Sequence, residues 1–284
     1  PQEQANVFYL RTHDDALVLR NELKPGARLV VVGGGFIGLE VAATARGLGC
    51  EVTLLEAGPR LAGRVLPSVI SDALLALHRE QGVDVRLNVA LECIHADAVQ
   101  LVDGQRLPCD LVVVGIGMQP NIELAAAAGL EVGQGIRVDA QLRTSAADIY
   151  AAGDVCEFRL AGLYQRQETW RNAEAQGRLA ALNLLGQALA FEMIPGFWSD
   201  QYAWGLHTVG VMTALMVRRE LPDGGLLLFY LDDRQHLQGA CGWALGNRAA
   251  KAIKLCEHLI TARIPLNRAS LADPEVSLKL LLRG

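Results

Sequence analysis

The segment ARLVVVGGGFIGLEVAATARGLGCEVTLLE, residues 27–56, constrains the fold more than any other stretch of the chain. A run of mostly β-branched residues, Leu29 to Val32, leads into Gly33-Gly34-Gly35-Phe36-Ile37-Gly38. A helical stretch and a second strand, Val52 to Leu55, follow. A G-x-G-x-x-G sequence between a strand and a helix, with an acidic residue ending the next strand, is typical of a Rossmann βαβ unit. The sequence therefore predicts an α/β fold.

This glycine loop predicts a dinucleotide site. Gly33 is expected to permit the tight turn, Gly35 to let a pyrophosphate approach the backbone, and Gly38 to let helix and strand pack closely. The helix N-terminus offers unpaired N–H groups to phosphates. Glu56, ending the second strand, is expected to accept hydrogen bonds from a ribose 2′-OH and to repel a 2′-phosphate, which favours NAD(H) over NADP(H). Phe36 and Ile37 lie between these glycines and complete the predicted cofactor-binding loop.

Glu40 lies two residues past Gly38, on a helix that is otherwise apolar near its start. A carboxylate in a first helix turn is favoured by the helix dipole alone, and that is one reading. The other is a functional position close to the bound nucleotide. The residues themselves leave both readings open.

Composition excludes several classes of protein. The 284 residues suggest about two domains. The net charge of −5 argues against nucleic-acid binding, which a basic surface would indicate. Apolar runs such as LVVVG, residues 111–115, are far shorter than a membrane span, and no signal peptide is visible. The six cysteines form no C-x-x-C pair, so we expect free, mostly buried thiols and a cytoplasmic protein.

The next part of the chain continues the α/β domain. Residues 67–87 predict a helix that Gly82 stops, followed by a strand. Residues 90–115 predict short strands with a turn at Asp103-Gly104 and a buried strand at the end. His78 and His95 have no ligand spacing and are expected at the surface. The sequence indicates no metal site.

A second glycine loop is not evident. Gly115-Ile116-Gly117 is followed by Pro120-Asn121, and the next helix is expected only near Ile122, so we interpret this stretch as a crossing between domains. Short strands are expected between residues 135 and 155, with the apolar strand IYAA running into Gly153-Asp154. A helix is expected within residues 168–186, with its N-terminus near Asn172 and Gly186 as its stop.

In this order, these segments resemble the FAD-dependent pyridine nucleotide-disulfide oxidoreductase family, in particular its NADH:ferredoxin reductase branch, which serves Rieske-type oxygenases and cytochrome P450 systems. The last of the matching segments is the most specific for the branch, whereas the glycine motifs are shared widely. The matching segments are YLRT (9–12), GGGFIGLEVA (33–42), VVVGIGMQPNIELA (112–125), DIYAAGDV (148–155), ETWRNAEAQG (168–177) and FWSDQY (197–202).

The resemblance implies three domains. Residues 1–116 would form a Rossmann-like NAD-binding domain, a three-layer ββα sandwich. Residues 117–195 would form the second half of an FAD-binding domain, and residues 196–284 an α+β C-terminal reductase or dimerisation domain. In the family, an N-terminal segment supplies the first FAD βαβ unit and its glycine loop. Because this chain starts without methionine and shows one loop, we expect a fragment that is inactive alone and holds little FAD.

The resemblance also implies roles for single residues. Glu40 matches an acid near nicotinamide and flavin, and Trp198 an aromatic beside the isoalloxazine, with a core tryptophan as the alternative. Arg11 matches an arginine near the FAD phosphates, and Asp154 the ribityl-binding acid. Trp170 matches a position whose backbone meets the flavin pyrimidine edge. Two further positions, Gly117 at the crossing and Ala173 in the helix that follows Trp170, complete the expected cofactor-binding set.

The implied activity is hydride transfer from NADH to FAD, followed by two one-electron steps to a 2Fe-2S ferredoxin or a Rieske-type oxygenase component. Alternatives are a reductase of rubredoxin or another carrier, an NADH oxidase, and a non-enzymatic NAD-binding protein like apoptosis-inducing factor. A homodimer is left open. Basic side chains of the C-terminal region are either merely solvated or a docking surface for an acidic ferredoxin. These are Arg218, Arg219, Arg248, Lys251 and Lys254.

Overall fold

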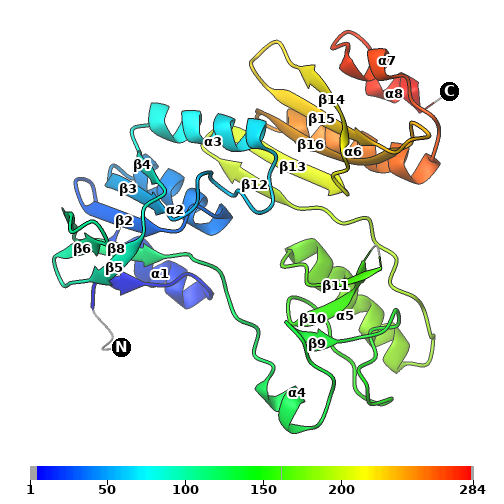
Figure 1. Cartoon of the computed structure of the whole chain (residues 1–284), viewed down its shortest axis with the longest axis horizontal. Coiled ribbons are helices and arrows are strands. Elements are labelled where there is room, and N and C mark those ends of the chain that lie inside the picture. Colours follow the sequence, from blue (N-terminus) through cyan, green and yellow to red (C-terminus); the bar gives the residue numbers. More distant parts are fainter. Residues whose placement is uncertain (1–4, 161, 283–284) are drawn as a thin grey trace. The chain divides into compact units, whose positions relative to one another are not determined.

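A computed structural model describes residues 5–160 and 162–282 (Figure 1). The chain divides into two compact units, which are described separately. The first unit runs to Gly117 and also takes in residues Ser199–Ala203. The second unit consists of Met118–Trp198 and the chain from Trp204 onward.

A five-stranded parallel sheet forms the centre of the first unit, in the order β1-β8-β2-β3-β4. Four consecutive residues of β2 are buried, as expected for a parallel strand covered on both faces. The strands are β1 (Val7–Phe8), β2 (Arg28–Val32), β3 (Glu51–Glu56), β4 (Asp84–Leu87) and β8 (Leu111–Val114).

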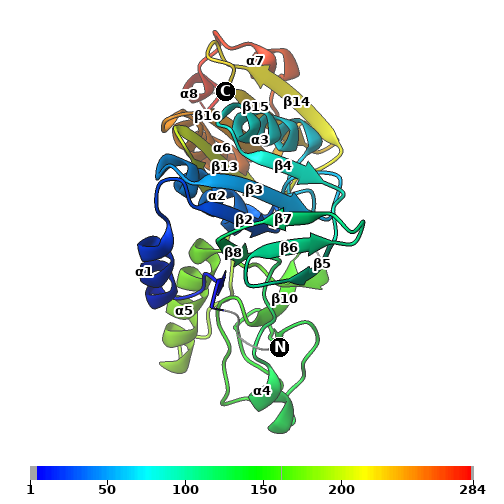
Figure 2. The same cartoon turned by 90° about the vertical axis from the view of Figure 1, so that its left-hand side faces the viewer.

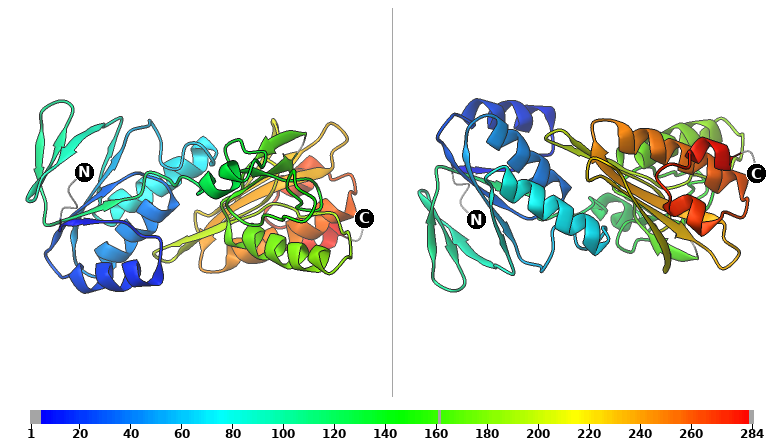
Figure 3. Two further views of the ribbon diagram at one scale, coloured as in Figure 1. Left: turned by 90° about the horizontal axis from the view of Figure 1, so that it is seen from below. Right: turned by 90° about the horizontal axis from the view of Figure 1, so that it is seen from above.

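Helices lie on one face of this sheet and an antiparallel meander lies on the other (Figures 2 and 3). The meander contributes Val99, Leu101 and Leu107 to a core that also contains Val30 and Leu55 of the parallel sheet. The three-layer ββα arrangement predicted from the sequence is thereby confirmed. The helices are α1 (His13–Glu22), α2 (Phe36–Gly47) and α3 (Ser68–Glu80), and the meander strands are β5 (Leu91–Ile94), β6 (Ala98–Leu101) and β7 (Arg106–Pro108).

The second unit begins with short elements around their own small core, which includes Leu142, Cys156 and Phe158. The strand expected before Gly153-Asp154 is wrong: the regular strand follows these residues, and Tyr150 makes only an isolated bridge to Arg143. The elements are α4 (Glu123–Ala127), β9 (Ile136–Arg137), β10 (Cys156–Leu160), β11 (Leu163–Gln165) and α5 (Trp170–Leu184). Thr169 caps α5, so this helix begins two residues before the predicted position.

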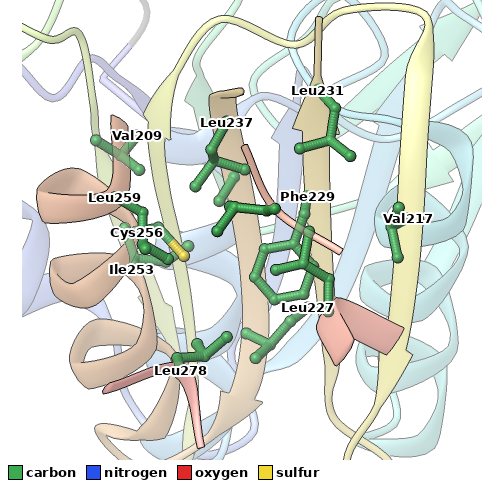
Figure 4. Packing of buried hydrophobic residues seen from close by; sticks show 13 residues of the cluster. Val209, Val217, Leu227, Phe229, Leu231, Leu237, Ile253, Cys256, Leu259 and Leu278 are labelled. Carbon is green, nitrogen blue, oxygen red and sulfur yellow. The ribbon is translucent and has the colours of Figure 1, made fainter. Parts of the chain in front are cut away.

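An antiparallel sheet with helix α6 on one face completes the chain, in the order β12-β13-β16-β15-β14. Phe229 of the fully buried strand β15 lies in the core, where Ile253, Cys256 and Leu259 of α6 also lie (Figure 4). The strands are β12 (Trp198–Gln201), β13 (Trp204–Gly210), β14 (Leu215–Glu220), β15 (Leu226–Leu231) and β16 (Leu237–Leu245). The helices are α6 (Arg248–Ala262), α7 (Arg268–Ala272) and α8 (Leu278–Leu281).

Arg219 belongs to this core and not to the surface where the sequence placed it. Only 4% of the residue is exposed, and its guanidinium donates to the carbonyl oxygens of Leu271 at 2.6 Å, Ser270 at 2.8 Å and Val276 at 3.0 Å. Burial lowers the pKa of this guanidinium, so it needs these acceptors. Arg219 therefore holds α7 and the segment that follows it in place, and it is not available to a docking surface.

All six cysteines are free thiols, and all except the half-buried Cys93 are buried. Burial raises the pKa of Cys156, Cys241 and Cys256 to about 12, which keeps these thiols protonated at neutral pH. The prediction of free and mostly buried thiols is confirmed.

Candidate nucleotide-binding site

The glycine loop joins β2 to α2 with a different physical constraint at each glycine. Gly33 has φ +108°, and a Cβ there would lie 2.5 Å from the carbonyl oxygen of Gly115. A Cβ at Gly38 would lie 2.0 Å from the carbonyl oxygen of Gly33. Gly35 caps α2 in an extended conformation, and nothing lies within 4 Å of the Cβ position there. The loop is thus closely packed at Gly33 and Gly38 and open at Gly35.

Glu56 ends β3 beside this loop. Its carboxylate accepts the backbone N–H of Gly34 at 2.7 Å through Oε2 and that of Gly58 at 2.6 Å through Oε1. A carboxylate accepts about four hydrogen bonds, so two of its lone-pair positions stay available to a ligand hydroxyl. Glu56 therefore holds the loop in place and can still accept from a ribose.

The two residues between the glycines differ in exposure. Ile37 is 51% exposed and Phe36 is half-buried. Both lie in the first turn of α2, directly after the open Gly35. A bound dinucleotide would cover apolar surface at this point.

Glu40 is not in the first turn of α2. The helix begins at Phe36 because Gly35 is extended, and its first turn holds no acidic residue. The dipole explanation proposed from the sequence is therefore wrong. More than a third of Glu40 is exposed, yet its Oε1 accepts from the Ser199 hydroxyl at 2.6 Å. Partial burial raises the pKa of the Glu40 carboxyl, the Ser199 hydrogen bond lowers it, and Asp200 raises it.

Ser199 belongs to a set of buried polar side chains that the sequence did not indicate. Gln201, two residues along β12, donates to the Ser199 Oγ at 3.2 Å and contacts His78 Nε2 at 2.7 Å. His78 is fully buried on α3, so its predicted surface position is wrong. A possible signal was its spacing of four residues from Leu74, which is on the apolar face of α3. His95 is half-buried, near Cys93 and Gln100.

The stretch after β8 matches the predicted crossing. Gly115 donates its N–H to the carbonyl of Val32 at 2.8 Å, and Gly117 follows with φ +107° and open space around it. Gly117 is the last residue of the first unit before the chain enters the second. The next helix, α4, begins at Glu123, as predicted.

Asp154, Trp170 and Ala173 lie in the second unit, around the start of α5. Gly153 has φ +85°, and a Cβ there would lie 3.5 Å from the Ala173 Cβ. Its N–H donates to Gln176 Oε1 at 2.8 Å, so α5 and the Gly-Asp turn are directly joined. Asp154 is half-buried, and its carboxylate makes no hydrogen bond or ion pair with the described residues.

Two tryptophans are exposed in the same unit. Trp170, the first residue of α5, is 66% exposed and Trp198 is 46% exposed, with ring centroids 6.0 Å apart in an edge-on arrangement. Large aromatic rings are seldom left this open to water without a use. Trp198 is not a core residue, so the alternative considered from the sequence is wrong.

The residues present fit a nucleotide at the first unit and part of a second cofactor site at the second. In the first unit, the space at Gly35 lies at a helix N-terminus, where anions bind favourably. In the second, Asn172 Oδ1 and Gln176 Nε2 are buried near the start of α5 without a hydrogen-bond partner among the described residues. Arg11, in the first unit, is exposed just before α1, and its N–H donates to Asp15 Oδ2 at 3.1 Å.

Residues 5–160 and 162–282 contain neither a metal-binding cluster nor a membrane-spanning helix. No group of three or more His, Cys, Asp or Glu residues there could hold a metal ion. None of the helices in that part of the chain is both long and apolar enough to cross a membrane.

Comparisons with known proteins agree with this geometry. The family described as pyridine nucleotide-disulphide oxidoreductase matches residues 1–177, and the one described as reductase C-terminal matches residues 196–282. The ferredoxin–NAD(+) reductase component of the anthranilate 1,2-dioxygenase system of Burkholderia cepacia is 42% identical over 96% of this chain and 69% of its own length. A rubredoxin–NAD(+) reductase of Pseudomonas putida is 40% identical over 74% of this chain and 56% of its own length.

A solved structure of a ferredoxin reductase has the same fold as this chain. The ferredoxin reductase for the CYP199A2 system of Rhodopseudomonas palustris superimposes with a TM-score of 0.90 at 37% identity, over 98% of this chain and 70% of that one. The α/β fold class and the resemblance drawn from the sequence are confirmed. The chain belongs to the pyridine nucleotide-disulphide oxidoreductase family, whose members use FAD and NAD(H), and it carries that family's reductase C-terminal domain.

Proposed function

We propose that this chain belongs to an NADH-dependent flavoprotein reductase that passes electrons through FAD to a 2Fe-2S ferredoxin of an oxygenase system. The observation that carries the proposal is the open Gly35 at the N-terminus of α2, beside the Glu56 carboxylate at the end of β3. The names of the relatives support the choice of electron acceptor, because they are ferredoxin reductases of oxygenase and P450 systems.

The first unit binds and orients NADH. The N-terminus of α2 takes the pyrophosphate over Gly35, with Phe36 and Ile37 beside it, while Gly33 and Gly38 keep the loop close to the strand. Glu56 accepts from the adenosine ribose and disfavours a 2′-phosphate by charge repulsion. Glu40, one turn further along α2, lies near the nicotinamide.

The second unit supplies residues for FAD. Asp154 would bind the ribityl chain of FAD, and the helix start at Trp170, with Ala173 one turn on, would hold the flavin pyrimidine edge. Arg11 and Gly117, which lie in the first unit, are proposed as cofactor-binding residues from the resemblance alone. The chemistry supplied by bound FAD would be acceptance of a hydride from NADH and release of electrons one at a time. The chain itself needs no acid or base for that chemistry; its residues position the reactants and exclude water.

Electron delivery occurs near Trp198. A hollow in the second unit is lined by Trp198, Arg171, His207 and Lys254, among other residues. Arg218 pairs with Glu220 and Arg248 pairs with Asp223, so these two arginines offer little net charge to a partner. Lys251 and Lys254 are exposed on α6. They are the basic residues that we expect to meet an acidic ferredoxin.

Rubredoxin is the second candidate acceptor, because a rubredoxin reductase is 40% identical to much of this chain. A carrier assay distinguishes the two. The flavin-loaded reductase to which this chain belongs is mixed with NADH and with a ferredoxin, a rubredoxin or oxygen alone, and carrier reduction is followed by absorbance. The proposal expects the fastest reduction with ferredoxin. Fastest turnover with oxygen would indicate an NADH oxidase, and nucleotide binding without electron transfer would indicate a protein like apoptosis-inducing factor.

The domain limits belong to the same proposal. We assign residues 1–116 to the NAD-binding domain, 117–195 to the second half of the FAD-binding domain, and 196–284 to the reductase C-terminal domain. The family matches to residues 1–177 and 196–282 support the last limit. A cytoplasmic location and a homodimer formed through the C-terminal domain are also proposed. Cell fractionation and light scattering of the purified protein test them.

A further inference from the structure

We propose that Ser199, Gln201 and His78 are positioning residues for Glu40: a directed chain of hydrogen bonds holds the Glu40 carboxylate in place for the nicotinamide. This inference rests on the proposed function, in which Glu40 lies beside the nicotinamide. All four residues belong to the first unit, although 159 positions of sequence separate Glu40 from Ser199.

The chain has three close links and one long one. Ser199 Oγ donates to Glu40 Oε1 at 2.6 Å, and Gln201 Nε2 donates to Ser199 Oγ at 3.2 Å. Gln201 Oε1 lies 2.7 Å from His78 Nε2, and the Tyr202 hydroxyl lies 3.5 Å from His78 Nδ1. Ser199 is 1% exposed, and Gln201 and His78 are fully buried. Water therefore does not compete for the bonds among Ser199, Gln201 and His78, whereas the Glu40 carboxylate itself is partly exposed.

The donors all point the same way. Gln201 uses its amide N–H toward Ser199, so its oxygen faces His78 and requires an N–H there. A neutral imidazole with its proton on Nε2 satisfies this and leaves Nδ1 to accept from Tyr202. Burial lowers the pKa of His78, which keeps the ring neutral, and the bond to Gln201 opposes that effect. Every link thus presents a donor toward Glu40 and favours its ionised form.

The position of the polar residues on β12 is not explained by strand formation. Ser199 and Gln201 alternate with Trp198 and Asp200, so the two buried polar side chains share one face of the strand. Apolar residues on a buried face would stabilise the unit without any need for partners. A set of polar side chains that ends at a partly exposed carboxylate is instead suited to controlling that carboxylate.

Other titratable or charged groups around Glu40 are few. Asp200 on β12 raises the pKa of Glu40. His78 on α3 and Tyr202 in the hairpin tip are neutral near pH 7, and burial raises the pKa of Tyr202 to about 12. Arg46, on the same helix as Glu40, acts on Tyr202. The Ser199 hydrogen bond is therefore the main interaction that keeps the carboxylate ionised.

Two measurements test the chain of hydrogen bonds. Difference infrared spectroscopy follows protonation of Glu40 directly, with the band assigned by its loss in Glu40→Gln. NADH affinity between pH 5 and pH 9 is measured by fluorescence. Ser199→Ala should move the Glu40 midpoint to higher pH by about one pH unit, the effect of one hydrogen bond to a charged group. The NADH-binding midpoint should move with it.

Gln201→Met is the second variant, because it keeps the length of the side chain and removes its hydrogen bonds. It should move both midpoints in the same direction by less than Ser199→Ala does. Ser71→Ala is the matched control, since Ser71 is a buried serine of the same unit whose hydroxyl has no partner among the described residues. This control should leave both midpoints unchanged.

The outcomes separate the two proposals. If Ser199→Ala and Gln201→Met leave the infrared midpoint where Ser71→Ala leaves it, the hydrogen-bond chain does not control Glu40 and the inference is wrong. If the infrared midpoint moves but Glu40→Gln binds NADH like the unmodified protein at every pH, the failure lies in the proposed nicotinamide role of Glu40. In that case the hydrogen bonds still control the protonation of Glu40, but they do not position it for a nicotinamide.

Discussion

The glycine loop and the tip of the β12–β13 hairpin belong to the same unit but specify their sites in different ways. In the loop, residues 33–38, the constraints act on the backbone: Gly38 packs against Gly33 inside the loop, Gly33 packs against Gly115, and Gly35 is open. In the tip, residues 199–203, the site is formed by hydrogen bonds between side chains, and the partners of these side chains lie on α2 and α3. A site made of local backbone can be recognised from spacing alone, whereas a site made of distant side chains cannot.

The largest effect is expected where the loop is most closely packed. Gly38→Ala would bring a Cβ to 2.0 Å from the Gly33 carbonyl oxygen, and a backbone shift would be needed to relieve the clash. We expect a loss of about 3 kcal/mol in the free energy of unfolding of the first unit, measured by urea denaturation.

Gly35→Ala is the matched control, because its Cβ would meet nothing within 4 Å. It should unfold close to the unmodified midpoint while binding NADH at least tenfold more weakly, since the methyl group takes the space that a pyrophosphate needs. Equal destabilisation by the two substitutions would remove the distinction drawn between packed and open glycines.

Glu56→Ala tests the nucleotide specificity of the loop. Removing the carboxylate takes away the acceptor for a ribose hydroxyl and the repulsion of a 2′-phosphate. The preference for NADH over NADPH should therefore narrow by about tenfold, or about 1.4 kcal/mol. Calorimetric titration with both nucleotides measures it. Because Glu56 also accepts from Gly34 and Gly58, circular dichroism should accompany the titration to show that the loop has kept its fold.

Glu40→Ala tests the residue that the hairpin tip contacts. In the flavin-loaded reductase to which this chain belongs, we expect flavin reduction by NADH to slow by about tenfold, roughly 1.4 kcal/mol in the activation barrier. The melting temperature should barely change, because the side chain is more than a third exposed. Stopped-flow absorbance measures the rate. A large loss of melting temperature with normal flavin reduction would assign Glu40 a structural role instead.

The smallest effect concerns pH and stability. Partial burial raises the pKa of Glu40 in the folded protein above its ordinary value of 4.5. The folded state therefore holds this proton more readily than the unfolded chain, and the associated stability is present below about pH 4.5 and lost as the pH rises through the folded pKa. Glu40→Gln should raise the melting temperature at pH 7 by only about 1 °C, since exposure screens the charge. No difference should remain at pH 4.

Much of the fold could be predicted from the sequence because its signals are local. The βαβ unit, the meander turn at Asp103-Gly104 and the helix after Pro67 all follow from spacing and turn residues. Arg219 and His78 could not be placed, because their burial depends on carbonyl and amide partners 51 to 123 positions away. The strand expected before Gly153 does not form because its N–H groups bond locally instead of to a neighbouring strand: Ile149 donates to Ala146 and Ala151 to Leu142.

The residues of the candidate site also differ in whether a local sequence motif indicates them. Gly33, Gly35, Gly38 and Glu56 were indicated by a local motif, and the resemblance to a known family added the tryptophans and Asp154. Ser199 and Gln201 lie inside the branch-specific FWSDQY segment, but nothing in that segment says which residue of α2 they contact. Whether Glu40 lies in the first turn of α2 depends on where the helix begins. Because Gly35 is the capping residue and the helix begins at Phe36, Glu40 lies just beyond the first turn.

A calorimetric titration of the unmodified protein with NADH and then NADPH tests the central claim most directly. The open Gly35 at the N-terminus of α2 and the Glu56 carboxylate beside it predict that NADH binds at least tenfold more tightly, about 1.4 kcal/mol. Equal affinity for the two nucleotides, or no binding of either, would contradict the assignment of this loop as an NADH site.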